Sequence, residues 1–163
     1  MDSSVVDRRR RGRPGIRAAA GVVAIVSLAA DHLTKVFAMH HWVTPVHLIG
    51  PVTLATTSNA GAAFSIFQGR SVLLAVLGGV LAAVLLVVLW RTQTWGIGLP
   101  IGLLLGGALG NGLDRAFSSN HEVTDFIATG FWPVFNVADA CITVACIWLG
   151  ISLALRARSD DGV

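Results

Sequence analysis

The chain has 163 residues, of which 54% are hydrophobic and 13% charged, with a mean hydropathy of +0.71. This composition excludes an ordinary soluble domain, and the length leaves no room for two domains of usual size. The formal net charge of +3 does not indicate nucleic-acid binding, because the basic residues gather near the N-terminus and at helix ends, as in membrane proteins. We therefore expect a single-domain integral membrane protein.

The first 17 residues hold six arginines and no apolar periodicity, so residues 1–15 are predicted to be a disordered basic cytoplasmic tail. A helix is expected over residues 15–39, where thirteen uncharged residues lead to Asp31 and Lys35. These two residues are four apart and share a helix face, so they can neutralise one another, either near the membrane surface or facing a site inside the bundle. A cleavable signal peptide is the alternative for this segment, but the polar continuation disfavours it.

Residues 40–67 are rich in β-branched residues and lack a helical pattern, which predicts two short strands over residues 43–49 and 52–57. A bare sheet edge cannot lie in lipid, so this segment should sit at the interface or over the bundle. His40, His41 and His47 resemble metal ligands, but no cysteine or acidic residue accompanies them. An interfacial role is favoured over a metal site.

Three more membrane helices are predicted, over residues 71–90, 94–115 and 131–155, followed by a polar cytoplasmic tail over 157–163. Small residues in the third, such as Gly106 and Gly110, allow close approach of a neighbouring helix. Cys141 and Cys146 fall on different faces of the fourth, which excludes a disulfide between them.

Four crossings put both termini on one side, and nine of the twelve basic residues lie on that side. Both termini are therefore expected to be cytoplasmic. The outward-running first and third helices then carry Asp31 and Asp114 to the outer face, and the fourth helix starts there near Asp139. The acidic residues should meet at the outer end of the bundle.

The pattern favours carboxylate chemistry, since the sequence has no HExxH zinc motif and no GxSxG nucleophile motif. Asp139 stands at the threshold of an uncharged run, where an acid usually has a function and a partner. Asp114 adjoins Arg115, whose charge would keep it ionised, whereas Asp125 lies in an apolar loop that would raise its pKa. The residues alone favour Asp125 as the partner of Asp139 and leave open that it is a solvated loop acid.

Five motifs in this order resemble the lipoprotein signal peptidases, bacterial signal peptidase II, over about residues 16–156: Asp31-His-Leu-Thr-Lys35, Asn59-Ala-Gly-Ala-Ala-Phe64, Gly106-Gly-Ala-Leu-Gly-Asn-Gly-Leu-Asp-Arg115, Val123-Thr-Asp-Phe126 and Phe135-Asn-Val-Ala-Asp139. The resemblance implies an all-α membrane fold, a four-transmembrane-helix bundle with a small extracytoplasmic β-cradle and a short surface helix, matched here by residues 62–68. It also implies an aspartic endopeptidase of the bacterial cytoplasmic membrane, acting at the outer face. Its substrates would be diacylglyceryl-modified prolipoproteins, cut just before the lipidated cysteine.

By motif position, the resemblance implies that Asp125 and Asp139 are the catalytic pair. Substrate-binding and orienting roles would fall to Asp31, Lys35, Asn59, Gly61, Asn111, Asp114, Arg115 and Asn136. The implied partners are prolipoproteins and membrane lipids. No metal, other cofactor, nucleic acid or obligate protein partner is expected.

The rival interpretation is a small multi-pass transporter or proton-relay subunit, because intramembrane Asp, Asn and Lys also mark ion pathways. A relay needs polar groups across the midplane, yet the second and third helices carry no charge between their ends. A purely structural subunit would not need acids from three helices at one level. The peptidase is the function that the sequence favours.

Overall fold

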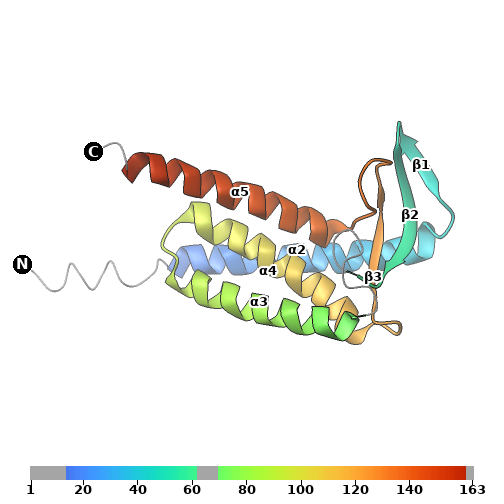
Figure 1. Cartoon of the computed structure of the whole chain (residues 1–163), viewed down its shortest axis with the longest axis horizontal. Coiled ribbons are helices and arrows are strands. Elements are labelled where there is room, and N and C mark those ends of the chain that lie inside the picture. Colours follow the sequence, from blue (N-terminus) through green and yellow to red (C-terminus); the bar gives the residue numbers. More distant parts are fainter. Residues whose placement is uncertain (1–13, 62–69, 161–163) are drawn as a thin grey trace, which may run out of the picture.

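The computed structural model describes residues 14–61 and 70–160 of the chain. Four helices, α2 (Pro14–His41), α3 (Ser71–Arg91), α4 (Trp95–Phe117) and α5 (Val137–Asp160), form an elongated bundle (Figure 1). Each is long and apolar enough to cross a membrane. The chain is therefore a multi-pass membrane protein, as predicted.

All four helices differ in their bounds from the predicted ones, α3 only by the one residue Arg91. α2 begins at Pro14, inside the predicted tail, since proline is accepted at the first helical position, where its missing N–H is not needed. α5 begins at Val137 instead of residue 131, because Phe135 pairs with a strand, and it continues to Asp160, past the predicted end. α4 runs two residues further than predicted. The surface helix expected over residues 62–68 and most of the N-terminal tail lie outside the described residues.

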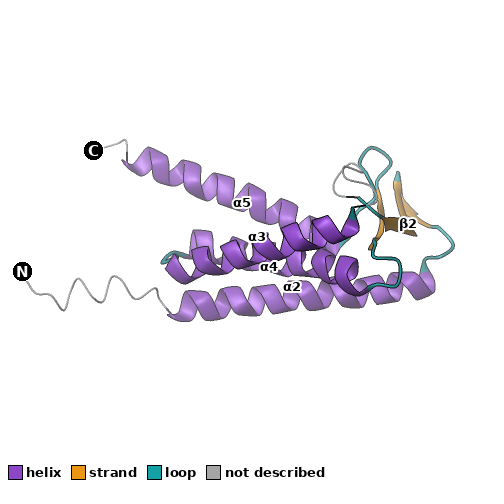
Figure 2. Ribbon diagram, turned by 60° about the horizontal axis from the view of Figure 1, so that its bottom comes forward, coloured by secondary structure: helices purple, strands orange, loops and turns teal. Residues whose placement is uncertain are grey.

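Helix α4 is the centre of the bundle and packs against α2, α3 and α5 (Figure 2). Glycines at every fourth position of α4 face α2: Gly98, Gly102, Gly106 and Gly110. A Cβ added at Gly106 would lie 2.6 Å from the Ser27 Cβ, so only glycine permits this approach. The predicted role of the small residues in close helix packing is confirmed.

A three-stranded antiparallel sheet, β1 (Val46–Ile49), β2 (Val52–Asn59) and β3 (Val123–Ala128), lies at one end of the bundle, opposite the start of α2 and the end of α5 (Figure 1). The strand order is β1-β2-β3, and Thr57 is paired with Asp125. The sequence analysis treated the segment around Asp125 as a loop, which is wrong. Val123–Ala128 forms a strand because β2 and Phe135 supply pairing partners on its two sides.

The last turn of α2 fixes the sheet to the bundle. Thr56 donates its backbone N–H to the Trp42 carbonyl (2.9 Å) and its hydroxyl to the Ala38 carbonyl (2.8 Å). The Trp42 ring lies 5.4 Å, centroid to centroid, from that of Phe126, the neighbour of Asp125 on β3. The strand that carries Asp125 is thus held against the end of α2.

Candidate active site

Lys35 and Asp31 of α2 form a buried ion pair at the sheet end of the bundle. Their charged atoms are 2.7 Å apart, and the residues are 2% and 1% exposed. Lys35 Nζ also lies 2.8 Å from Asp114 Oδ2 of α4. The predicted pairing of Asp31 with Lys35 is confirmed. Asp114 pairs with Lys35 and not with its neighbour Arg115, because successive side chains point in different directions around a helix.

Asp31 also joins α2 to α5. Its Oδ1 accepts the backbone N–H of Ala138 at 2.8 Å, one of the first N–H groups of α5 that no helix carbonyl can satisfy. The carboxylate fits there because Gly110 of α4 has no side chain. A Cβ at that position would lie 2.5 Å from Asp31 Oδ2.

Asn111 of α4 connects this charge cluster to Asp139. Its Oδ1 accepts a hydrogen bond from Lys35 Nζ at 3.0 Å, and its Nδ2 donates to Asp139 Oδ1 at 2.8 Å. A lysine ammonium can only donate, so Lys35 fixes which end of the amide faces Asp139. The Asn111 NH₂ group is thereby directed at the carboxylate.

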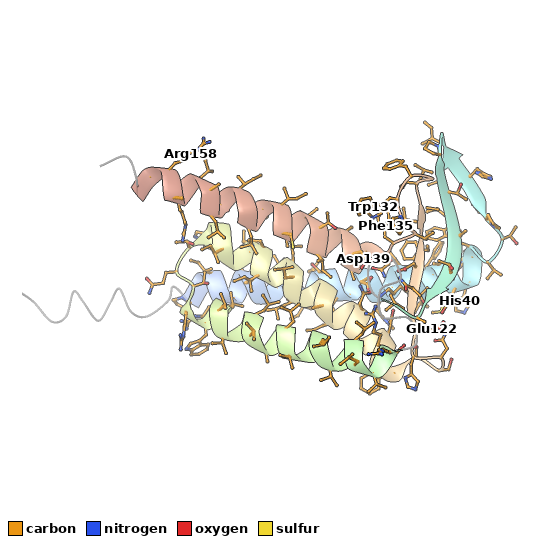
Figure 3. All side chains as sticks on the ribbon, in the orientation of Figure 1. His40, Glu122, Trp132, Phe135, Asp139 and Arg158 are labelled. Atoms are coloured by element: carbon orange, nitrogen blue, oxygen red, sulfur yellow. The ribbon has the colours of Figure 1, made fainter. Side chains whose placement is uncertain are left out.

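Asn136 and Asp139 cap the start of α5 reciprocally. Asn136 precedes the first helical residue, and its Oδ1 accepts the Asp139 N–H at 2.9 Å. In return, Asp139 Oδ2 accepts the Asn136 N–H at 3.2 Å. This arrangement resembles a capping box and leaves Asp139 at the sheet end of α5 (Figure 3).

Asp125 of β3 is 1% exposed, so its carboxyl is removed from water by the protein itself. Its oxygens accept hydrogen bonds from Asn59 Nδ2 (2.9 Å) and Asn136 Nδ2 (2.6 Å). Burial raises the pKa of Asp125 from 3.8 to about 6; the Asn59 hydrogen bond opposes the rise, and the charge of Asp139 adds to it. The prediction of a desolvated acid is confirmed, and the alternative of a solvated loop acid is wrong.

Asn136 bridges the two carboxyl groups that the sequence analysis paired. Its side-chain amide donates to Asp125, and its backbone N–H donates to Asp139. The same amide contacts Asn111 Oδ1 at 3.0 Å and the Thr124 carbonyl at 3.3 Å. Strand β3 and the start of α5 are therefore held together at the carboxyl pair.

Arg115 and Gly61 position the end of β2. Arg115 Nη2 donates to the Gly61 carbonyl at 2.6 Å, and the Gly61 N–H donates to Asn59 Oδ1 at 2.9 Å. Asn59 is thereby oriented so that its NH₂ group faces Asp125. All ten predicted site residues belong to this one network.

Backbone groups that the sequence analysis did not single out also belong to the network. The Ala138 N–H binds Asp31, and the Thr124 N–H lies 3.4 Å from Asp114 Oδ2. No residue type identifies a backbone contribution of this kind. Only the position of Thr124 beside Asp125 within one motif could have suggested it.

The three histidines considered as metal ligands, His40, His41 and His47, make their hydrogen bonds outside the site. Nδ1 of His40 and of His41 contacts a carbonyl of the preceding turn, and His47 contacts Thr53 across β1 and β2. Within residues 14–61 and 70–160, no group of three or more His, Cys, Asp or Glu residues is arranged to hold a metal ion. The two cysteines are free, in agreement with their spacing.

A multi-pass bundle that brings two carboxyl groups together at one end has the arrangement expected of a membrane-embedded aspartic hydrolase. A family model described as signal peptidase (SPase) II matches residues 23–155. The chain belongs to the signal peptidase II family and is an aspartic peptidase. Family membership sets aside the transporter and structural-subunit alternatives.

Relatives and solved structures agree with this assignment. A lipoprotein signal peptidase of Rhodococcus jostii (strain RHA1) is 43% identical over 150 residues, which cover 86% of this chain and 74% of the relative. One of Mycolicibacterium smegmatis is 42% identical over 153 residues, covering 86% of this chain and 63% of the relative. A solved structure described as a bacterial membrane enzyme superposes with a TM-score of 0.81 at 25% identity, over 93% of this chain and 94% of the other.

Proposed function

We propose that this protein removes the signal peptide of diacylglyceryl-modified prolipoproteins by cutting before the lipidated cysteine, with Asp125 and Asp139 as the catalytic dyad. The observation that carries the proposal is the bridge through Asn136, which donates to both carboxyl groups. Lys35, Asp31 and Asp114 form a charge cluster, in which Lys35 and Asp31 are buried, and this cluster orients Asn111 toward the dyad. These residues orient the carboxyl groups and do not themselves react.

The raised pKa of Asp125 supports it as the carboxyl that holds the shared proton before reaction. Asp139 takes a proton from water, the hydroxide adds to the scissile carbonyl carbon, and Asp125 gives its proton to the carbonyl oxygen. A neutral gem-diol results. Asp125 then recovers a proton from one hydroxyl while Asp139 protonates the leaving nitrogen and the C–N bond breaks. Both carboxyl groups return to their starting states without a covalent intermediate.

The substrate enters from the side, with its signal helix among the helices and its acyl chains in the bilayer. Helices α3 and α5 both pack on α4 and make few contacts with one another, which supports entry between them. The outward surfaces of α3 and α5 are apolar up to the arginines at their ends, as a lipid-facing path requires. The scissile bond would come to rest at the sheet end, where water is available.

The site faces the outer side of the bacterial cytoplasmic membrane, and both termini are cytoplasmic. Arg158 lies at the bundle end opposite Asp139 (Figure 3), where α3 ends at Arg91 and α5 carries Arg156. Helix α2, which the arginine-rich segment precedes in the sequence, begins at that same end. An excess of Arg and Lys marks the cytoplasmic side of a membrane protein. The protein acts on prolipoproteins within lipid and needs no obligate protein partner.

The test is cleavage of a purified diacylglyceryl-modified prolipoprotein in detergent, with chelator present and the products identified by mass. The parent should release the signal peptide with the lipidated cysteine as the first residue of the mature product. Asp139→Asn should reduce the rate to background while retaining the parent's unfolding temperature. Cleavage elsewhere, or an active Asp139→Asn variant, would contradict the proposal.

A further inference from the structure

An apolar patch projects from the sheet, outside the active site. It consists of Leu48 and Ile49 at the tip of the β1–β2 hairpin and Phe131 and Trp132 in the segment between β3 and α5. We call it the tip patch. Ile49 is 79% exposed and Phe131 is 83% exposed, values that large apolar side chains seldom show together in contact with water.

The two parts of the tip patch lie side by side, although about eighty residues separate them in the sequence. Gly130 has a positive φ of 80°, and a Cβ placed there would lie 3.3 Å from the Pro51 Cβ. The turn after β1 therefore packs on the segment that carries Phe131. Figure 1 shows the hairpin tip extending sideways beyond the outer end of α5.

The charge distribution around the patch identifies its partner. Residues 42–61 and 123–136 contain one charged residue, Asp125, which is buried in the active site. A sheet that stood in water above the membrane would carry charged side chains on its exposed surface. The surface around the tip patch is uncharged, as a surface that contacts lipid requires.

The patch also continues a surface that faces lipid. Helix α5 follows directly from the Phe131 segment. From Val144 onward, towards its C-terminal end, it exposes apolar side chains such as Val144 and Ile147. Trp132 lies near the start of this helix (Figure 3), at the level where tryptophan is enriched in membrane proteins. The apolar belt of the bundle and the tip patch thus form one surface.

We propose that the tip patch inserts into the interfacial region of the outer leaflet and anchors the sheet to the membrane. The occupant of the patch is the lipid surface itself, and not a partner protein. Because β3 belongs to the same sheet, this contact holds Asp125 at a fixed depth relative to the bilayer. The inference concerns membrane contact and holds whatever substrate the site accepts.

The test uses full-length protein in lipid nanodiscs, with Cys141 and Cys146 replaced by Ala. A cysteine introduced by Ile49→Cys or Phe131→Cys carries an environment-sensitive NBD label. The matched control is Ser119→Cys, in the exposed polar loop between α4 and β3. We expect labels at 49 and 131 to emit at shorter wavelength, to be quenched several-fold by headgroup-proximal nitroxide lipids and to resist aqueous dithionite. The label at 119 should behave oppositely.

Equal dithionite reduction rates at 49, 131 and 119, with no lipid quenching at any of them, would overturn the proposal. Each labelled variant must first show the same unfolding temperature as the parent protein. This control ensures that a sheet displaced by the label is not mistaken for a folded sheet that does not contact lipid. Leu48→Cys, on the same hairpin, replaces either position if its label disturbs folding. Quenching of a label by an added protein in the absence of lipid would equally contradict a lipid partner.

Discussion

Lys35 satisfies three acceptors at once, Asp31, Asp114 and Asn111, and each of its N–H groups has a partner within 3.0 Å. The i, i+4 spacing with Asp31 was visible in the sequence. The contacts with Asp114 and Asn111 were not, because they depend on how closely α2 approaches α4. A single lysine thus compensates the carboxylates of Asp31 and Asp114 and sets the orientation of the Asn111 amide that faces Asp139.

Lys35→Met should destabilise the protein strongly. Removing one partner of a buried ion pair costs about 3–5 kcal/mol, because the remaining charge is left unpaired. The double variant Lys35→Met/Asp31→Asn should recover part of that loss. Thermal unfolding in detergent measures both. An unfolding temperature of Lys35→Met equal to the parent's would show that the cluster does not contribute as described.

The unfolding free energy of Asp125→Asn, compared with that of the parent, should increase as the pH rises. The pKa of Asp125 is 3.8 when unfolded and about 6 when folded. Between these values the folded state keeps a proton that the unfolded state has lost, so the stability of the parent falls as the pH rises through this window. The total loss above pH 6 is about 3 kcal/mol, at 1.36 kcal/mol per pH unit.

The measurement is the difference in unfolding free energy between Asp125→Asn and the parent at pH 4 and at pH 7.5. Effects of the substitution that do not depend on pH cancel in this comparison. A buried acid that destabilises the fold at neutral pH is expected of a catalytic residue retained for its chemistry. A difference that stays constant with pH would rule out the raised pKa.

At the scale of elements, the helices were predictable because long, mostly apolar runs form helices in a membrane, although the uncharged run of α2 is only thirteen residues long. Strand β3 could not be predicted in this way, because Val123–Ala128 is short and depends on two pairing partners. One partner, β2, is far away in the sequence, and the other, Phe135, follows after a turn. The start of α5 was missed for the same reason. Residues 131–136 are uncharged and therefore suit a membrane helix by composition, but Phe135 pairs with Ile127 of β3 instead.

The glycines of α4 allow a matched test of helix packing. A Cβ at Gly102 would collide with the Ala20 backbone of α2, whereas one at Gly112 meets nothing within 4 Å. Gly102→Ala should therefore destabilise by about 1–3 kcal/mol, as overpacking does. Gly112→Ala should be neutral or stabilising by up to about 1 kcal/mol, since alanine favours the helix. Equal thermal unfolding of the two variants would refute the close contact.

At the scale of the whole molecule, the bundle holds its polar network, which includes Arg115, at one end and Arg91, Arg156 and Arg158 at the other. The sequence predicted this polarity, because helix direction alternates: Asp31 and Asp114 lie late in outward-running helices, and Asp139 lies at the start of an inward-running one. It could not predict that all ten site residues would join one continuous network. That outcome depends on the sheet covering the bundle and bringing Asn59 and Asp125 to the start of α5.

The proposed topology makes a direct prediction for reporter fusions in a bacterial host. Green fluorescent protein fused after Val163 should fluoresce, because it folds in the cytoplasm, and alkaline phosphatase at the same position should be inactive. Phosphatase inserted in the exposed loop at Ser119 should be active. The reverse pattern would place the site on the cytoplasmic side and refute the topology.

The catalytic assignment is tested most directly by comparing Asp125→Asn with Asp114→Asn in the prolipoprotein cleavage assay. Both substitutions remove one carboxylate at the same end of the bundle, but only Asp125 is bridged to Asp139 through Asn136. We predict background cleavage for Asp125→Asn and measurable, reduced cleavage for Asp114→Asn, with both proteins folded. If Asp125→Asn still cuts while Asp114→Asn does not, the carboxyl pair is wrongly assigned.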